Sequence, residues 1–390
     1  MKQRFWFILA LLIAGSLLLS ACIPGGGGIC GGAAQQGWSG PVVADDTIYV
    51  GTMDGEVVAL NPSSRSARYG FPAEGEWSFS LGGGATGGFL SCAAATSVTF
   101  YGSPVVADGV VYVGASYGKI YALNATAGYD IWEYPRDTYI GSIVSSPVLA
   151  NGILYVGSSD GNLYAIDLET RRLAWDSPFA AGDEIWATPL VHDGVVYFSS
   201  LDHKLYAVDV ETGEPVWESP FETGGAIAAT PLIHNSTIYI GSFDSKLYAI
   251  NLDGTSKWDE PFAAGGWFWT KAVNYGDIII VGSLDGKIYA LDAETGDEVW
   301  ESPFETGGAI RGDPALSGEL VIFGSEDGTV YALEASTGFE RWYKTLEPAT
   351  QVRASLYAGD GVVYVHATDQ TIYALEIENG TQLWSFASGE

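Results

Sequence analysis

The chain has 390 residues, of which 47% are hydrophobic, and it carries 17 basic against 47 acidic residues for a formal net charge of −30. A surface this acidic repels nucleic acid and anionic lipid headgroups. The composition therefore excludes a nucleic-acid partner, and any membrane attachment has to come from an anchor.

Residues 1–21 predict a secretory signal. Lys2 and Arg4 form a short basic region, residues 5–19 form an apolar run, and small residues close the run before Cys22. Such a run is too short for an ordinary membrane span. The letters LSAC at residues 19–22 resemble a bacterial lipobox, and this resemblance implies that the chain is a lipoprotein acylated at Cys22.

Residues 22–37 form a lipidated, glycine-rich tether, because glycine-rich segments behave as flexible coils. Ile23 follows the cysteine, and by the sorting rule of such lipoproteins it favours the outer membrane if the cell has one, and otherwise the outer face of the cytoplasmic membrane. Two further cysteines remain, Cys30 in the tether and Cys92 downstream. An oxidising compartment allows them to pair as a disulfide, and two free thiols are the alternative.

From residue 38 to residue 390 one unit of about 42 residues occurs eight times, a period typical of β-propellers. Each unit opens on a small or apolar pair, and the second member of that pair occupies one column: Pro41, Pro104, Pro147, Pro189, Pro231, Ala272, Pro314 and Leu356. The first two openings are 63 residues apart and the others 41 to 43, so about 21 residues are inserted within about 74–99. We predict an all-β, eight-bladed propeller of four-stranded antiparallel blades.

The fourth unit illustrates the predicted strands, which cover 189–192, 195–199, 204–208 and 214–217. Asp-Gly pairs such as Asp160-Gly161 lie between the second and third strands, where a tight hairpin needs positive φ angles. They also resemble calcium loops, but the spacing of metal ligands is absent. A tryptophan ends each unit from Trp132 onward, with Tyr69 in its place in the first unit, and we expect this column to pack on the neighbouring blade.

One column predicts a binding site. The residue three places before each opening position should lie where the chain enters the innermost strand, so all eight should surround one mouth of the central channel. These residues are Trp38, Tyr101, Val144, Trp186, Ala228, Trp269, Arg311 and Arg353, with Lys271 close by. Aromatic rings with arginines suit a carbohydrate, an aromatic or anionic ligand, or an extended peptide. Alternatively, the tryptophans fill the channel as core and the arginines neutralise acids such as Asp313.

The segments 154–175 and 278–300 resemble the repeat of pyrroloquinoline-quinone-type propellers, and this resemblance covers essentially the whole mature chain. Two branches share the repeat: quinone-dependent dehydrogenases, and non-catalytic lipoproteins similar to BamB of the outer-membrane β-barrel assembly machinery. The alcohol-oxidising enzymes are longer and have an adjacent cysteine pair, which is missing here. His192 and His234 share one column, but that column also holds Ala150 and Tyr275, so it predicts a strand end rather than a ligand pair.

The lipoprotein branch fits the length, the lipobox and the eight copies. It implies an exported protein that is not an enzyme, has no cofactor or metal, and acts as a scaffold, as a monomer or as a subunit of a complex. Its partners would be envelope proteins, including β-barrel assembly components, and it would contact the membrane through the lipid anchor only. A second hypothesis is an extracytoplasmic ligand-binding protein that uses the channel mouth. A third is a PQQ-dependent dehydrogenase.

Overall fold

The computed structural model describes residues 39–66, 69–81, 98–347 and 350–388. The chain divides into two units, Met1–Gln35 and Gln36–Glu390, and every described residue belongs to the second. The signal, the tether and the cysteines Cys22, Cys30 and Cys92 lie outside the described residues, so the predictions made for them stay predictions.

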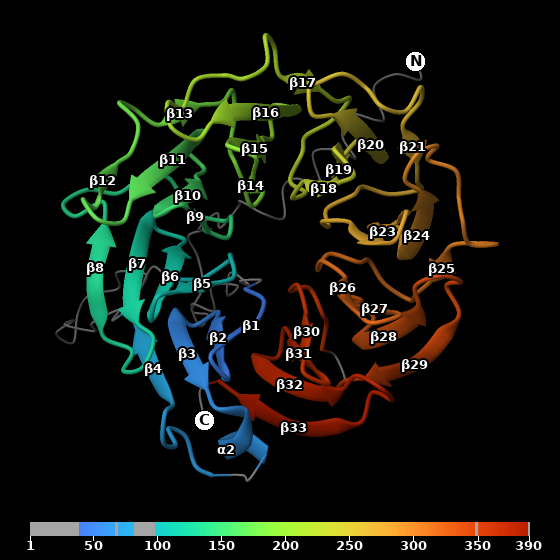
Figure 1. Cartoon of the computed structure of the whole chain (residues 1–390). Coiled ribbons are helices and arrows are strands. Elements are labelled where there is room, and N and C mark those ends of the chain that lie inside the picture. The colour runs from blue at the N-terminus through green and yellow to red at the C-terminus, as the bar shows by residue number, and fades with distance from the viewer. Residues whose placement is uncertain (1–38, 67–68, 82–97, 348–349, 389–390) are drawn as a thin grey trace, which may run out of the picture. The chain divides into compact units, whose positions relative to one another are not determined.

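The second unit is an eight-bladed propeller, as predicted, with consecutive blades arranged around a central channel (Figure 1). In every described blade the strands pair antiparallel and in chain order from the channel outward. Blade 1 consists of β1 (Val42–Ala44), β2 (Thr47–Gly51), β3 (Glu56–Leu60) and β4 (Trp77–Ser80). Blade 2 consists of β5 (Val105–Ala107), β6 (Val110–Ala115), β7 (Lys119–Asn124) and β8 (Asp130–Tyr134).

Blades 3 to 6 have shorter outer strands. Blade 3 consists of β9 (Val148–Ala150), β10 (Ile153–Gly157), β11 (Asn162–Asp167), β12 (Arg172–Leu173) and β13 (Phe179–Ala180), and blade 4 of β14 (Leu190–His192), β15 (Val195–Ser199), β16 (Lys204–Asp209) and β17 (Phe221–Glu222). Blade 5 consists of β18 (Leu232–His234), β19 (Thr237–Gly241), β20 (Lys246–Asn251) and β21 (Phe262–Ala263). Blade 6 consists of β22 (Val273–Tyr275), β23 (Ile278–Gly282), β24 (Lys287–Asp292) and β25 (Phe304–Glu305).

Blades 7 and 8 again have full outer strands. Their strands are β26 (Ala315–Ser317), β27 (Leu320–Gly324), β28 (Thr329–Glu334), β29 (Glu340–Thr345), and β30 (Tyr357–Gly359), β31 (Val362–His366), β32 (Thr371–Glu376), β33 (Gln382–Ala387). The short helix α2 (Pro62–Ser66) lies between β3 and β4.

The outer strand of blade 4 corrects one predicted boundary. We expected it at 214–217, but only a single bridge, between Val208 and Pro215, forms there, and the strand itself is β17. Prolines interrupt this region in blades 3 to 6, at Pro178, Pro220, Pro261 and Pro303. Proline lacks the N–H that a strand donates to its neighbour, so the outer strand resumes only after it.

The tryptophan column packs on the neighbouring blade, as expected. Trp175 donates its indole N–H to the carbonyl of Val210 at 3.0 Å, and Trp342 donates to Ile377 at 2.7 Å. In each case the acceptor lies 35 residues further along the chain, in the next blade. Trp175 also lies over Gly213, where an added Cβ would be 2.6 Å from the indole and φ is +73°. A glycine is required at that turn because the ring occupies the space of a side chain.

The assignment of Tyr69 to this column was wrong. Trp77 takes the place in blade 1, since its indole N–H donates to the Ala125 carbonyl of blade 2 at 2.8 Å, whereas Tyr69 is 64% exposed. The sequence comparison missed Trp77 because extra residues, including α2, precede it. Strand β4 therefore lies inside the predicted insertion at 74–99, of which residues 82–97 are outside the described residues.

Aspartates in the turns between the second and third strands provide another inter-blade contact. Asp244 accepts hydrogen bonds from the Lys246 N–H and from the Gly224 N–H, both at 3.0 Å, and from the Tyr248 hydroxyl at 2.5 Å. Gly224 belongs to the segment arriving from blade 4, so the carboxylate ties two blades together. Burial, followed by the bond to Asp244, raises the pKa of Tyr248 to about 12.

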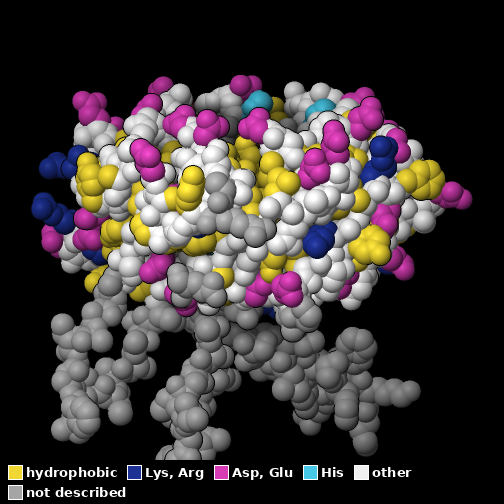
Figure 2. Space-filling model, turned by 90° about the horizontal axis from the view of Figure 1, so that it is seen from below, with side chains coloured by type: hydrophobic (Ala, Val, Ile, Leu, Met, Phe, Trp, Pro, Cys, Tyr) yellow, Lys and Arg dark blue, Asp and Glu magenta, His cyan; other side chains and the backbone are white. Residues whose placement is uncertain are grey.

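The ring closes without exchanging a strand, because all four strands of blade 8 come from the C-terminal segment. Blades 1 and 8 share a core that includes Ile48, Ile372 and Trp384. At its edge the guanidinium of Arg65, on α2, lies 5.3 Å from the ring centre of Phe386. Arg65 also pairs with Glu76 at 2.6 Å, and both side chains are buried. In Figure 2, acidic side chains outnumber basic ones on the visible surface. Arg65 is a basic residue that is buried.

Replacing Arg65 by alanine should destabilise the propeller by about 3–5 kcal/mol, because it leaves the fully buried carboxylate of Glu76 without its counter-charge. Urea denaturation measures the loss. Arg172→Ala, at an exposed arginine, is the matched control and should change stability by less than about 0.5 kcal/mol. The double variant Arg65→Met with Glu76→Gln should recover part of the loss. Equal stability of all variants would contradict a stabilising role for the Arg65–Glu76 pair.

His366 should make closure sensitive to acid. Its Nδ1 lies 2.9 Å from the carbonyl oxygen of Ser39 in blade 1, and its buried Nε2 has no hydrogen-bond partner in the described part of the chain. Burial lowers the pKa of His366, so the folded protein keeps it neutral while the unfolded chain protonates it near pH 6.5. Its stabilising contribution is therefore present above that pH and is lost as the pH falls below it.

Melting curves between pH 7.5 and 5.5 test this. The wild-type melting temperature should fall over the interval, and His366→Asn, which retains a donor towards Ser39, should flatten the slope. His192→Asn, at a half-exposed histidine, should leave the wild-type slope unchanged. A slope that survives in His366→Asn would mean that another group controls it.

Candidate functional site

Backbone hydrogen bonds link the inner ends of the blades around the channel. In six pairs of neighbouring blades, the backbone N–H at the position just before the opening column donates to the side-chain oxygen of the same position in the next blade, over 2.7–3.3 Å. The links run from Gly40 to Ser103, Ser146, Thr188 and Thr230, and from Lys271 to Asp313 and Ser355. We call this set the hydroxyl ring.

Lys271 and Asp313 replace the hydroxyls in blades 6 and 7. An ammonium group has no lone pair to accept a hydrogen bond, so the pattern of acceptors changes at Lys271. The backbone N–H of Lys271 donates to Oδ1 of Asp313 at 2.7 Å. Removal from water raises the pKa of Asp313, although this N–H and the charge of Lys271 oppose the shift. The surroundings of Asp313 therefore disfavour its own ionised form.

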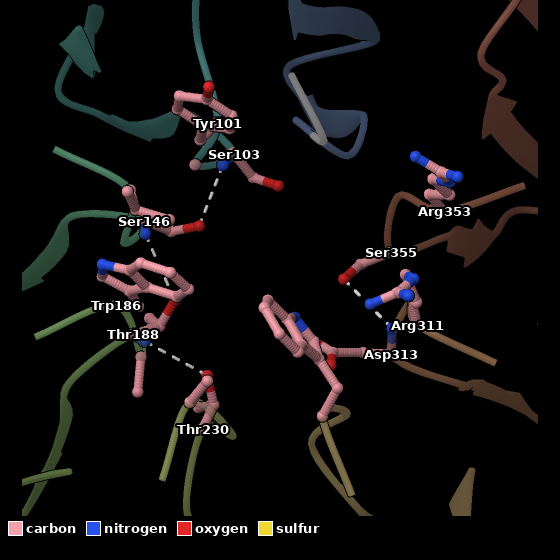
Figure 3. Close-up of a pocket in the computed structure, with 15 residues that line it drawn as sticks. Tyr101, Ser103, Ser146, Trp186, Thr188, Thr230, Arg311, Asp313, Arg353 and Ser355 are labelled. Atoms are coloured by element: carbon pink, nitrogen blue, oxygen red, sulfur yellow. Dashed lines mark hydrogen bonds between the residues drawn. The ribbon is translucent and has the colours of Figure 1, made fainter. Parts of the chain in front are cut away.

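A cavity of about 100 Å³ opens above the hydroxyl ring. Five of the aromatic and basic residues predicted at the channel mouth line it: Tyr101, Trp186, Trp269, Arg311 and Arg353. Figure 3 shows Tyr101 and Trp186 on one side of the opening and Arg311 and Arg353 across from them. The repeat alignment thus located residues that meet in space although they come from five different blades. Their role in binding stays a prediction.

Trp269 contacts two neighbouring side chains. Its ring stacks on Phe243 with 5.2 Å between the ring centres, and the guanidinium of Arg311 lies 5.6 Å from its centre. Phe243 in turn stacks on Trp267, which is 43% exposed. A sugar that stacked on Trp269 would compete with these contacts for the ring.

The two arginines share one carboxylate. Arg311 donates its Nε–H to Oε1 of Glu326 at 2.5 Å, and Nε of Arg353 lies 3.0 Å from the same oxygen. Glu326 is not among the residues that line the cavity, whereas both arginines are. The carboxylate therefore orients the guanidiniums from behind, and two positive charges face one negative charge at this corner.

The other aromatic residues complete the wall. Trp186 donates its indole N–H to Glu184 at 2.7 Å, and its ring centre is 6.1 Å from that of Trp269, with a tilt of 46°. Burial raises the pKa of Tyr101, so its hydroxyl remains protonated at neutral pH. Val144 and Ala228 of the same column also line the cavity.

Two predicted residues do not line this cavity as described. Lys271 lies in the hydroxyl ring and is not part of the lining. Trp38 lies outside the described residues. The sequence analysis missed Glu326 and Phe243, which position the arginines and Trp269. Each directly precedes the turn aspartate of its repeat. Glu326 is the one acidic residue in that column, and this difference could have identified it from the sequence.

Metal coordination has no support in the described ranges, where no group of three or more His, Cys, Asp and Glu side chains could hold an ion. His192 lies 3.3 Å from Asp193, and His234 lies 3.5 Å from Asp277, so each histidine has a separate acidic neighbour. No helix among the described residues is long and apolar enough to cross a membrane.

A family model described as outer membrane protein assembly factor BamB matches residues 31–260 and 284–390. The chain belongs to the BamB family. The match covers the propeller repeats, which agrees with the resemblance noted in the sequence. No curated protein matches the chain.

Two solved structures resemble this BamB-family propeller. The computationally designed Ika8 protein has a TM-score of 0.68 and 18% identity, over 88% of this chain and 97% of that chain. BamB from Moraxella catarrhalis has a TM-score of 0.66 and 20% identity, over 86% of this chain and 93% of that chain. At these identities the likeness shows a shared fold.

Replacing Asp313 by asparagine tests the electrostatics of the channel wall. Because the folded state raises the pKa of Asp313, its ionised form is disfavoured there, and Asp313→Asn should be at least as stable as the wild type at pH 7. The difference should shrink as the pH falls and Asp313 becomes protonated. Thermal melts at pH 7 and pH 4 measure it, with exposed Asp259→Asn as the control. A destabilised Asp313→Asn at pH 7 would show that the ionised form is the favoured one.

Proposed function

We propose that this protein is a lipid-anchored envelope scaffold that holds components of the outer-membrane β-barrel assembly machinery and performs no catalysis itself. The observation that carries the proposal is the match of the BamB family model to most of the propeller. The lipobox at residues 19–22 supports an anchor at Cys22, and an acidic surface makes such an anchor necessary.

The contacts between blades suit a scaffold. The interface between blades 3 and 4, for example, combines packing of Trp175 at the outside, the turn aspartate Asp202 at one face and the hydroxyl ring at the channel, so loops are held at defined positions. The outer strand β29 and the turn before it expose aromatic side chains, with Phe339 68% and Tyr343 61% exposed. Aromatic residues are enriched in protein interfaces, so this outer edge is a candidate contact region for a partner.

Affinity purification from cross-linked native membranes tests the proposal. The tagged lipoprotein should recover β-barrel assembly components, identified by mass spectrometry. Cys22→Ala should remove the protein from the membrane fraction and reduce that recovery, because the anchor concentrates it at the membrane. An unrelated soluble domain carrying the same residues 1–37 controls for proximity at the membrane.

Recovery of solute-uptake or wall-associated proteins, without assembly components, would overturn the scaffold role and favour the ligand-binding alternative at the channel mouth. A quinone absorbance band together with dye-linked dehydrogenase activity in the purified protein would contradict the non-catalytic assignment.

A further inference from the structure

We propose that the cavity at the channel mouth binds a carboxylate carried on an extended polypeptide, with Arg311 and Arg353 as its charged partners. The inference rests on the geometry of the mouth and does not depend on the assembly role, so each can fail without the other.

Charge is the first argument. The chain has 47 acidic residues, yet the cavity lining contains one acidic side chain, Asp313, against two arginines. The counter-ion of the arginines, Glu326, lies behind them and outside the lining. An anion in the cavity would therefore meet two guanidiniums first, and Arg presents planar N–H donors that match a carboxylate.

Both arginine side chains are partly exposed. Their side chains are 27% and 24% exposed, and that of Glu326 is 16% exposed. The hydrogen bond from the Nε–H of Arg311 to the carboxylate of Glu326 fixes the orientation of the guanidinium, and Arg311 still lines the cavity. A pre-oriented guanidinium loses less conformational entropy on binding than a mobile one.

The aromatic wall limits the class of ligand. Phe243 and Arg311 both contact the Trp269 ring, and the indole N–H of Trp186 is already bonded to Glu184, so the wall offers mainly ring carbon atoms and edges. Ring edges carry partial positive charge, which favours an anion and disfavours a cation. Stacking of a sugar ring, one of the ligand classes that the sequence allowed, has little support at Trp269.

The volume points to a side chain. Pockets for cofactors and drug-sized ligands have about 300–1,000 Å³, whereas this cavity has about 100 Å³. A single acidic side chain fits, with its backbone left at the rim. Trp267, which is 43% exposed and is connected to Trp269 through the stacked ring of Phe243, offers an apolar surface to the flanking residues of the same peptide. A short extended segment with a central Glu and aromatic neighbours therefore matches both the cavity and its rim.

Titration with defined peptides tests the proposal. The probes are the acetylated and amidated pentapeptides GYEYG and GYQYG, which differ in one charge, and sodium acetate as a free carboxylate; binding is followed by calorimetry on the purified mature protein. The Glu peptide should bind roughly tenfold more tightly than the Gln peptide. The double variant Arg311→Gln with Arg353→Gln should remove that preference, and the matched control Arg172→Gln should retain it.

Glu326→Gln gives a test of opposite sign. Gln keeps an amide oxygen that can accept from the Nε–H of Arg311, but it removes the negative charge that competes for the guanidiniums, so binding of the Glu peptide should strengthen by about threefold, a gain that general damage to the fold would not produce. This variant keeps the proposal testable if the double arginine variant fails to fold, and the melting curve of each variant is recorded first.

Equal affinities for the Glu and Gln peptides would overturn the proposal, and so would weaker binding in Glu326→Gln. If sodium acetate bound as tightly as the Glu peptide, the rest of the polypeptide would contribute nothing to the affinity, and the assignment to a partner chain would be wrong.

Discussion

The contact on which this structure depends is the one between the tryptophan at the end of a blade and the turn of the next blade. The indole N–H donates to a backbone carbonyl 35 residues further on, and the ring covers a glycine such as Gly213 or Gly380. A single blade cannot bury its own faces, so each must be covered by a neighbour. Because the contact recurs at a fixed place in the repeat, it determines both the packing of adjacent blades and the need for glycine at one turn.

Closure of the ring cannot use a repeated contact alone, since the chain has to join its first blade to its last. Here α2 and the segment after it supply the extra contacts, with Arg65 paired to Glu76 and packed on Phe386. A buried ion pair is costly to break because one charge remains without a partner. This local solution explains why the segment between β3 and β4 includes residues that help to close the ring.

Repeated contacts also leave certain positions free to differ. The column that surrounds the channel mouth varies in residue type, from Val144 and Ala228 to Trp186, Trp269 and the two arginines. The result is an asymmetric opening in a nearly symmetric ring. Family membership describes the ring, whereas the mouth was inferred from this chain's own residues, and the two therefore support separate proposals about partners and about a carboxylate ligand.

The sequence by itself determined the eight-bladed propeller, the tryptophan packing and the set of residues at the mouth, because period and column position are properties of order along the chain. It failed at Tyr69, where extra residues before Trp77 broke the count, and at the outer strand of blade 4, where proline moved the pairing to Phe221–Glu222. Only the tertiary structure decided that Glu326 holds both arginines and that Phe243 stacks on Trp269. These pairs join different columns of the repeat, and sequence order does not record which columns meet across a blade interface.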